Sequence, residues 1–275
     1  MSVATYAAAQ LLRVLPRTRI SQMVGRLCDQ PLSPAASRLV TRVYSRIYEV
    51  DLTDAARIDG GAAYASFDAF FTRALRPGAR VTSSDPLTSP ADGVLESTGV
   101  IDEASWLTVK GKPYDVGELI GDPVDAARFA GGEYAVVYLS PRDYHRVHAP
   151  VDGVIGTIRG IPGDLYPVNA IGERHVPRLF ARNSRVAICI DTREYGRVIV
   201  VMVGAMIVGR ISVPMLPGPA VPPGVHDIEP PRPVKRGDEI GTFHLGSTAV
   251  VLVERGLTIR RPLGAVRFGQ TLSPS

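Results

Sequence analysis

The pattern of apolar and polar positions predicts helices in the first 80 residues. Residues 7–15 are mostly apolar and stop at Pro16, and Ser33 followed by Pro34 is a favourable helix start. Apolar residues then recur at helical spacing: Ala36, Leu39, Val40, Val43 and Ile47. Arginines form an i, i+4 row beside them: Arg38, Arg42 and Arg46. A helix lying in a membrane interface has this pattern, and so has a helix packed on its own core with solvated arginines.

A third helix is predicted from Ser66 to about Pro77. Ser66 is a suitable N-cap, and three phenylalanines follow at i, i+3 and i+4 spacing: Phe67, Phe70 and Phe71. Aromatic residues at this spacing are more often core than a ligand site, so we assign them to packing.

From about Val81 the pattern changes to short apolar runs between glycine, proline and aspartate turns. The clearest predicted strands are residues 132–139, 185–191, 197–208 and 249–254. The 27 glycines and 23 prolines fit a body of many turns and short strands. We therefore predict an α+β fold, with a helical membrane-associating segment over residues 1–80 and a β-rich sandwich or barrel-like catalytic domain over residues 81–275.

A short sequence repeat lies within the strand-rich part. Residues 89–94 read SPADGV, and residues 149–154 read APVDGV. Each copy combines a proline-bounded entry, an Asp-Gly turn and a strand that starts with valine. The repeat predicts an internal duplication, although two copies are too few for a solenoid.

Positive charge is concentrated at the N-terminus. The formal net charge is +4, and the first 50 residues alone carry +5, from seven arginines against Asp29 and Glu49. Apolar residues interleave with these arginines, which favours an anionic membrane surface rather than nucleic acid as a partner.

The sequence predicts no membrane-spanning segment. No segment reaches the 18 or more apolar residues of a spanning helix; the uncharged runs at residues 1–12 and 198–209, for example, have 12 residues each. The start also lacks the features of a signal peptide. Cys28 and Cys189 are far apart and form neither a disulfide framework nor a metal-ligand pattern, so a cytoplasmic address is the default.

Two stretches carry residues suited to chemistry. At Gly246-Ser247 the chain can bend sharply, so that the serine hydroxyl can approach the preceding carbonyl; alone, such a dipeptide is usually a simple turn. His145 and His148 follow Ser140-Pro141, which predicts a short helical turn with both histidines on one face. Two histidines on one face beside an Asp-Gly motif indicate a site rather than core packing.

The chain resembles the bacterial-type phosphatidylserine decarboxylases, which are self-processing pyruvoyl enzymes. The matching segments follow the family's order over about residues 35–270: Phe67–Arg73, Pro90–Gly93, Tyr138–Pro150, Gly163–Asn169, Leu179–Asn183, Val203–Gly209 and Gly241–Thr248. The paired histidines and the Leu-Gly-Ser-Thr sequence near the C-terminus are the specific part of the match.

The resemblance implies roles for individual residues. It makes Ser247 the nucleophile that attacks the Gly246 carbonyl, His148 its general base and Asp92 the residue that orients His148, in the logic of an activated-serine triad. Cleavage between residues 246 and 247 would leave a large chain, 1–246, associated with a small chain, 247–275, that begins with a pyruvoyl group derived from Ser247. His244 matches no invariant histidine of the family and is assigned only as a neighbour of the cleavage site.

The resemblance also implies that the covalent pyruvoyl group is the cofactor and phosphatidylserine the substrate. A Schiff base with the substrate amine would act as an electron sink while CO2 leaves, giving phosphatidylethanolamine for phospholipid biosynthesis. His145, with a near-neutral pKa, is the expected proton donor, and Tyr138 and Tyr144 are weaker candidates for the substrate pocket. We expect no metal and no nucleic acid, and a peripheral location on the cytoplasmic face of the cell membrane; formation of a homo-oligomer is left open.

Two other functions would use the same residues. A metal-dependent hydrolase would use His145, His148 and Asp92 as ligands but would give Gly246-Ser247 no role. A non-catalytic lipid-binding or carrier-like module would account for the Asp-Gly β repeats but would leave the paired histidines idle. The three hypotheses differ in metal content and in whether the chain is cut before Ser247.

Overall fold

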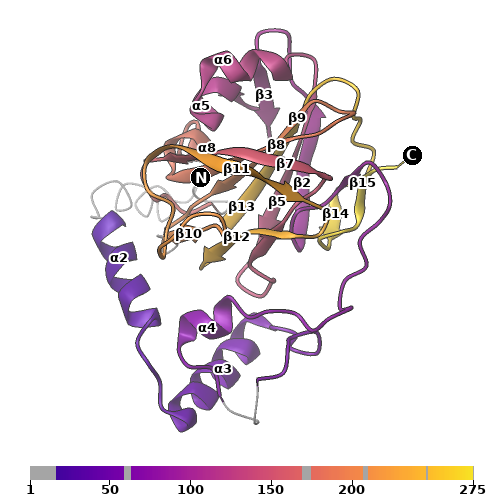
Figure 1. Cartoon of the computed structure of the whole chain (residues 1–275). Helices are drawn as coiled ribbons and strands as arrows, with labels where there is room; N and C mark the ends of the chain where they lie inside the picture. The colour runs from indigo at the N-terminus through magenta and orange to yellow at the C-terminus, as the bar shows by residue number, and fades with distance from the viewer. Residues whose placement is uncertain (1–16, 59–62, 169–174, 207–209, 246, 275) are drawn as a thin grey trace.

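The computed structural model describes residues 17–58, 63–168, 175–206, 210–245 and 247–274. Figure 1 shows a strand-rich body with one group of helices below it and a second group above it. The helix predicted over residues 7–15 lies outside the described residues.

The lower group contains α2 (Arg17–Cys28), α3 (Pro34–Tyr48) and α4 (Phe67–Phe71). The predicted start of α3 is confirmed, because the Ser33 hydroxyl accepts a hydrogen bond from the Ala36 N–H at 3.3 Å. Helix α4 begins after its predicted cap, Ser66, but ends at Phe71 rather than near Pro77. Helix α2 was not predicted, although its apolar positions recur at helical spacing: Ile20, Met23, Val24 and Leu27.

An eight-stranded antiparallel sheet forms the centre of the body (Figure 1). In spatial order its strands are β11 (Gly224–Val234), β7 (Gly153–Ile161), β8 (Arg185–Asp191), β9 (Arg197–Val203), β13 (Ser247–Val253), β5 (Glu133–Leu139), β2 (Gly93–Val100) and β14 (Gly264–Val266). The strands predicted at β5, β8 and β13 are confirmed to within two residues, whereas β9 ends at Val203 rather than at residue 208.

Both faces of this sheet are buried. Along β9, alternate residues belong to two separate core clusters, with Val200 in one and Val201 in the other. The first cluster includes Phe243 and Ile211 from a three-stranded sheet of β10 (Arg210–Ser212), β12 (Glu239–His244) and β6 (Arg146–His148). A strand buried on both faces reads as a continuous apolar run, which explains the sequence of β9.

The second cluster lies under short elements on the other face. These are the hairpin of β3 (Trp106–Val109) and β4 (Lys112–Asp115) and the helices α5 (Val116–Ile120), α6 (Pro123–Ala126), η2 (Ala127–Phe129) and α8 (Leu179–Arg182). Phe71 of α4 and Leu245, just after β12, belong to the same cluster, so the lower helices pack against the core near the end of β12. A separate two-stranded antiparallel sheet joins distant parts of the chain. It consists of β1 (Leu87–Thr88) and β15 (Thr271–Ser273).

The two Asp-Gly motifs lead into β2 and β7, each of which begins at the glycine of its motif, Gly93 or Gly153. β2 lies between β5 and β14, and β7 lies between β11 and β8. The internal duplication and the boundary near residue 80 stay predictions. Among the described helices, none is both long and apolar enough to cross a membrane.

Candidate active site between β12 and β13

The Gly246-Ser247 dipeptide joins the small sheet to the large one. β12 ends at His244, and β13 begins at Ser247, whose backbone lies opposite Leu139 at the end of β5. The loop that carries His145 leaves β5 at this same end of the sheet. Gly246 and the side chain of Ser247 lie outside the described residues.

His145 is held beside the end of β12. Its carbonyl accepts a hydrogen bond from the Phe243 N–H at 2.9 Å, and its ring stacks on Phe71 with centroids 4.0 Å apart. The side chain is fully buried, and neither ring nitrogen has a hydrogen-bond partner among the described residues. A buried polar group without a partner is rare, and it calls for a structural or catalytic reason.

The environment of His145 favours a neutral ring. Burial and, to a smaller extent, the positive charge of Arg73 lower the pKa of His145 to about 3, against a smaller opposing effect of the Ser140 backbone. The expected near-neutral pKa is therefore wrong for this structure, because the ring is removed from water and lies near a cation. Protonation of His145 at neutral pH requires a nearby anion.

The loop between β5 and β6 is not the helical turn that the sequence predicts. The Asp143 carboxylate accepts hydrogen bonds from the Ser140 N–H and hydroxyl, both at 2.7 Å, but the chain makes only a turn there and continues as β6 from Arg146. His148 lies in β6, His145 precedes that strand, and the two rings contact different aromatic side chains. The predicted shared face is wrong, because residues i and i+3 of an extended chain point to opposite sides.

His148 is oriented by three neighbours. Its Nδ1 lies 2.7 Å from the Gly237 carbonyl oxygen, which can only accept, so Nδ1 donates this hydrogen bond. Its Nε2 lies 3.2 Å from the Tyr144 hydroxyl, and its ring stacks on Phe268 with centroids 3.7 Å apart. Burial lowers the pKa of His148, while the Gly237 carbonyl and nearby carboxylates oppose this shift. The neutral ring therefore has its lone pair on Nε2, the arrangement that a general base needs.

Asp92 lies in the same region but is bound by other groups. The Arg80 Nε donates to its carboxylate at 3.1 Å, and the Phe268 N–H donates to it at 2.9 Å. In the described part of the chain no hydrogen bond joins Asp92 to His148, whose backbone N–H donates to the Pro90 carbonyl at 2.8 Å. The charge of Asp92 nevertheless raises the pKa of His148. The orienting role of Asp92 stays a prediction.

Sequence reasoning missed three residues that contact His148 or Asp92: Arg80, Gly237 and Phe268. Each lies in a turn or an irregular segment, where no periodicity marks it, and Gly237 and Phe268 are far along the chain from the histidine that they contact. Of the two tyrosines predicted for the pocket, Tyr144 contacts His148, and burial raises its pKa. Tyr138 lies on β5 opposite the residue that follows Ser247.

Asn183 connects three of the segments that carry the family resemblance. Its Oδ1 accepts a hydrogen bond from the Tyr166 N–H at 2.9 Å, and its Nδ2 donates to the carbonyls of Tyr166 and Gly204, both at 2.8 Å. Gly204 directly follows Val203, which lies opposite Thr248 in the sheet. This fully buried amide therefore supports the chain beside the start of β13.

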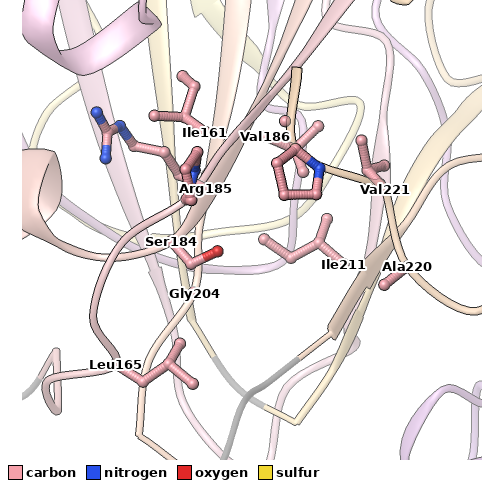
Figure 2. Close-up of a pocket in the computed structure, with 12 residues that line it drawn as sticks. Ile161, Leu165, Ser184, Arg185, Val186, Gly204, Ile211, Ala220 and Val221 are labelled. Carbon is pink, nitrogen blue, oxygen red and sulfur yellow. The ribbon is translucent and has the colours of Figure 1, made fainter. Parts of the chain in front are cut away.

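A small cavity of about 60 Å³ lies next to this network (Figure 2). Figure 2 shows the apolar side chains of Val186, Ile211 and Val221 around it, while the guanidinium of Arg185 extends away from it. The Arg185 Nε donates instead to the Leu119 carbonyl at 2.8 Å. The cavity has room for a few water molecules but not for a phospholipid, so we do not assign it to the substrate.

A larger cavity of about 430 Å³ opens beside Asp92 and Tyr144. Its lining includes five arginines: Arg73, Arg80, Arg142, Arg261 and Arg267. Carboxylates line it as well: Glu49, Asp51, Asp54, Asp92 and Asp143. A wall of mixed charge suits a polar, zwitterionic group better than acyl chains.

Among the described residues, no three histidine, cysteine, aspartate or glutamate side chains form a group able to hold a metal ion. Asp92, His145 and His148 therefore do not form the ligand set that the hydrolase hypothesis requires.

Comparison with known proteins assigns the chain to a family. A family model described as phosphatidylserine decarboxylase matches residues 67–273. A phosphatidylserine decarboxylase proenzyme from Anaeromyxobacter sp. (strain K) is 40% identical over 274 residues, covering 95% of each chain. A proenzyme of the same name from Psychrobacter cryohalolentis is 40% identical, and the match covers 89% of this chain and 88% of the relative. Another, from Bordetella pertussis, is 39% identical, and the match covers 98% of this chain and 93% of the relative. This chain belongs to the phosphatidylserine decarboxylase family, a family of carboxy-lyases.

Proposed function

We propose that the chain is a precursor that cuts itself between Gly246 and Ser247 and then converts phosphatidylserine to phosphatidylethanolamine with a pyruvoyl group formed from Ser247. The observation that carries the proposal is the position of His145. It is a fully buried ring without a hydrogen-bond partner among the described residues, beside the strand that leads into the cleavage dipeptide. Family membership and the proenzyme names of the relatives support the same conclusion.

Self-cleavage needs a base for the Ser247 hydroxyl. In the proposed reaction His148 Nε2 takes the hydroxyl proton as the oxygen attacks the Gly246 carbonyl, and the proton then passes to the departing nitrogen, which leaves an ester. Loss of the Cα proton expels the Gly246 carboxylate and gives dehydroalanine at residue 247. Water then replaces the nitrogen, releasing ammonia and leaving the pyruvoyl group. The Tyr144 hydroxyl must first move away from Nε2.

The surroundings of His145 fit such a group, because its ring nitrogens are buried and have no partner among the described residues. A pyruvoyl group supplies a carbonyl that accepts the electrons released when an amino acid loses CO2. His145 would return a proton to the substrate α-carbon. A substrate anion beside the ring would oppose the charge of Arg73 and raise the pKa of His145, which favours the protonated donor.

The two products of cleavage are expected to stay together. The small chain would contribute β13, which pairs with both β9 and β5 of the large chain, and also β14 and β15. Val250 and Val251 of β13 are fully buried, one in each core cluster. Separation would expose both faces of a central strand, so the small chain is expected to remain part of one folded unit.

The lower helices support attachment to an anionic membrane surface. The apolar stripe of α3 faces outward: Leu39 is 61% exposed and Ile47 is 66% exposed, whereas Ser37 is buried. On α2, Met23 and Leu27 are exposed to a similar extent. Exposed apolar residues beside exposed arginines fit the interface of an anionic bilayer, and the proposed location is the cytoplasmic face of the cell membrane.

Mass spectrometry of the purified protein tests the proposal. We expect two chains, 1–246 and 247–275, and a small chain lighter than its sequence by the mass of ammonia. Ser247→Ala should give one uncut, inactive chain, because no hydroxyl remains to attack. The exposed Ser84→Ala is a matched control and should mature normally.

Two further variants test the proposed roles of His148 and Asp92 in self-cleavage. His148→Ala and Asp92→Asn should slow the appearance of the small chain in a time course after synthesis. Normal maturation of both would remove them from the cleavage machinery. An undivided protein that still decarboxylates phosphatidylserine would contradict the whole proposal.

A further inference from the structure

His244 lies three residues before Ser247, and both of its ring nitrogens are bound. Nδ1 lies 2.9 Å and 3.0 Å from the two carboxylate oxygens of Asp68, and Nε2 lies 2.9 Å from the Ser212 hydroxyl. An ionised carboxylate only accepts, so Nδ1 donates to Asp68 and the ring is held in one orientation. The side chain is 16% exposed.

Asp68 connects this ring to the lower helices. It lies in α4, next to the phenylalanines that pack on the core, and an Arg210 nitrogen lies 3.3 Å from its carboxylate. The same guanidinium donates to Asp29, which directly follows α2, at 2.6 Å. Arg210 is also the residue opposite His244 in the β10–β12 pair. Segments from α2, α4 and β10 therefore meet at the last residue of β12.

The neighbouring residue anchors β12 on its other side. Phe243 is fully buried, and its N–H donates to the carbonyl of His145 at 2.9 Å. Adjacent residues of a strand point to opposite faces. Phe243 thus fixes the strand end to the core and the histidine loop, and His244 fixes it to the helices.

Asp68, His244 and Ser212 have the connectivity of a serine-hydrolase triad, but they line neither of the two cavities described above. A hydrolytic site needs space for a substrate next to the nucleophile. The cluster does lie directly before the peptide bond that is proposed to break. Its geometry therefore favours a role in holding the chain rather than in attacking a second substrate.

We propose that His244 is a positioning residue for self-cleavage: held by Asp68 and Ser212, it fixes the end of β12 so that the Gly246 carbonyl meets the Ser247 hydroxyl. This inference rests on the proposed self-cleavage. An intramolecular attack depends steeply on alignment, and a displacement of about 1 Å can cost roughly 100-fold in rate. The lower helices would thereby contribute to maturation, because Asp68 belongs to α4.

The test is a time course of maturation after cell-free synthesis of the full chain. His244→Phe keeps a ring but removes both hydrogen bonds, and it should slow cleavage roughly 10- to 100-fold. His244→Asn keeps a donor near the position of Nδ1 and should recover part of the rate. His226→Phe is the matched control, because this histidine lies on β11 and bonds only the Pro222 carbonyl among the described residues.

A control for folding uses the Ser247→Ala background, in which no cleavage is expected. The assay is run at a temperature at which the His244→Phe, Ser247→Ala double variant is folded by circular dichroism. Asp68→Asn, which removes the negative charge facing His244 and Arg210, should also slow cleavage. Combining it with His244→Phe should cost less than the sum of the two single effects, because both changes act on the Asp68–His244 contact. Additive effects, or equal rates for the phenylalanine and asparagine variants, would overturn the role of the Asp68 contact.

The outcomes separate this inference from the function on which it rests. If the unaltered chain is not cut before Ser247, the proposed function fails. If the unaltered chain is cut and His244→Phe is cut at the same rate, the function stands and the positioning role of His244 is refuted.

Discussion

Replacing Asn183 with alanine is expected to destabilise the precursor by about 3 kcal/mol. The amide makes three hydrogen bonds in a fully buried position, to the Tyr166 N–H, the Tyr166 carbonyl and the Gly204 carbonyl. Alanine removes all three hydrogen bonds.

The size of this loss in unfolding free energy follows from the backbone groups that lose their hydrogen bonds to Asn183. The Tyr166 carbonyl keeps a second donor, the Met206 N–H at 3.3 Å, whereas the Gly204 carbonyl loses the partner that the structure shows for it and the Tyr166 N–H loses its hydrogen bond to Asn183. A buried group without a partner costs about 1–3 kcal/mol and a lost hydrogen bond about 0.5–1.5 kcal/mol, so the two effects together cost about 1.5–4.5 kcal/mol. This is a large part of the stability of about 5–15 kcal/mol that is typical of a folded domain.

Urea unfolding in a Ser247→Ala background measures the effect, because the chain stays in one piece; coincident transitions by two spectroscopic probes are required before a free energy is taken from the curve. Gln30→Ala is a suitable control, since this exposed amide makes one hydrogen bond, to the Arg26 carbonyl at 3.3 Å. We expect a change of less than about 0.5 kcal/mol for the control.

Asn183→Asp provides a pH-dependent version of the experiment. The aspartate can still accept from the Tyr166 N–H, but an ionised carboxylate would face two carbonyl oxygens, so burial and repulsion should raise its pKa in the folded state. The folded state then binds more protons than the unfolded state, and stability should increase as the pH falls through the raised pKa. A loss below about 1 kcal/mol for Asn183→Ala, or no pH dependence for Asn183→Asp, would refute the reasoning.

Two further predictions concern turnover and membrane binding. His145→Ala should still be cut but should lose decarboxylation by at least about 100-fold, because no acid remains beside the substrate; CO2 release per processed molecule measures this, and a normal rate would exclude His145 as the donor. Leu39→Asp combined with Ile47→Asp should weaken sedimentation with anionic vesicles by more than about tenfold, since two exposed apolar side chains no longer enter the bilayer. The unfolding midpoint should stay unchanged, and Val100→Asp, an exposed position on β2, is the control; unaltered vesicle binding by the double variant would contradict the interfacial role of α3.

Local sequence patterns predicted helix starts and strands correctly where a few neighbouring residues determine the backbone conformation. The cap at Ser33, the start of α4 at Ser66 and the strand β8 agree with the sequence because each depends on contacts or periodicity within a few positions. The same reasoning failed for the loop after Ser140. There the Asp143 carboxylate binds back to Ser140 and the chain continues as β6, which pairs with β12 almost a hundred residues later.

The strand-rich body, the basic amphipathic N-terminal helix and the residue types that resemble a self-processing decarboxylase can be read from residue order alone. The burial of His145 near Arg73, the stacking of His148 on Phe268 and the contact of His244 with Asp68 become visible only in the folded chain. They could not be read from residue order because pKa values and hydrogen-bond partners depend on what surrounds a side chain in space. Strand pairing and helix packing bring those surroundings from distant parts of the chain.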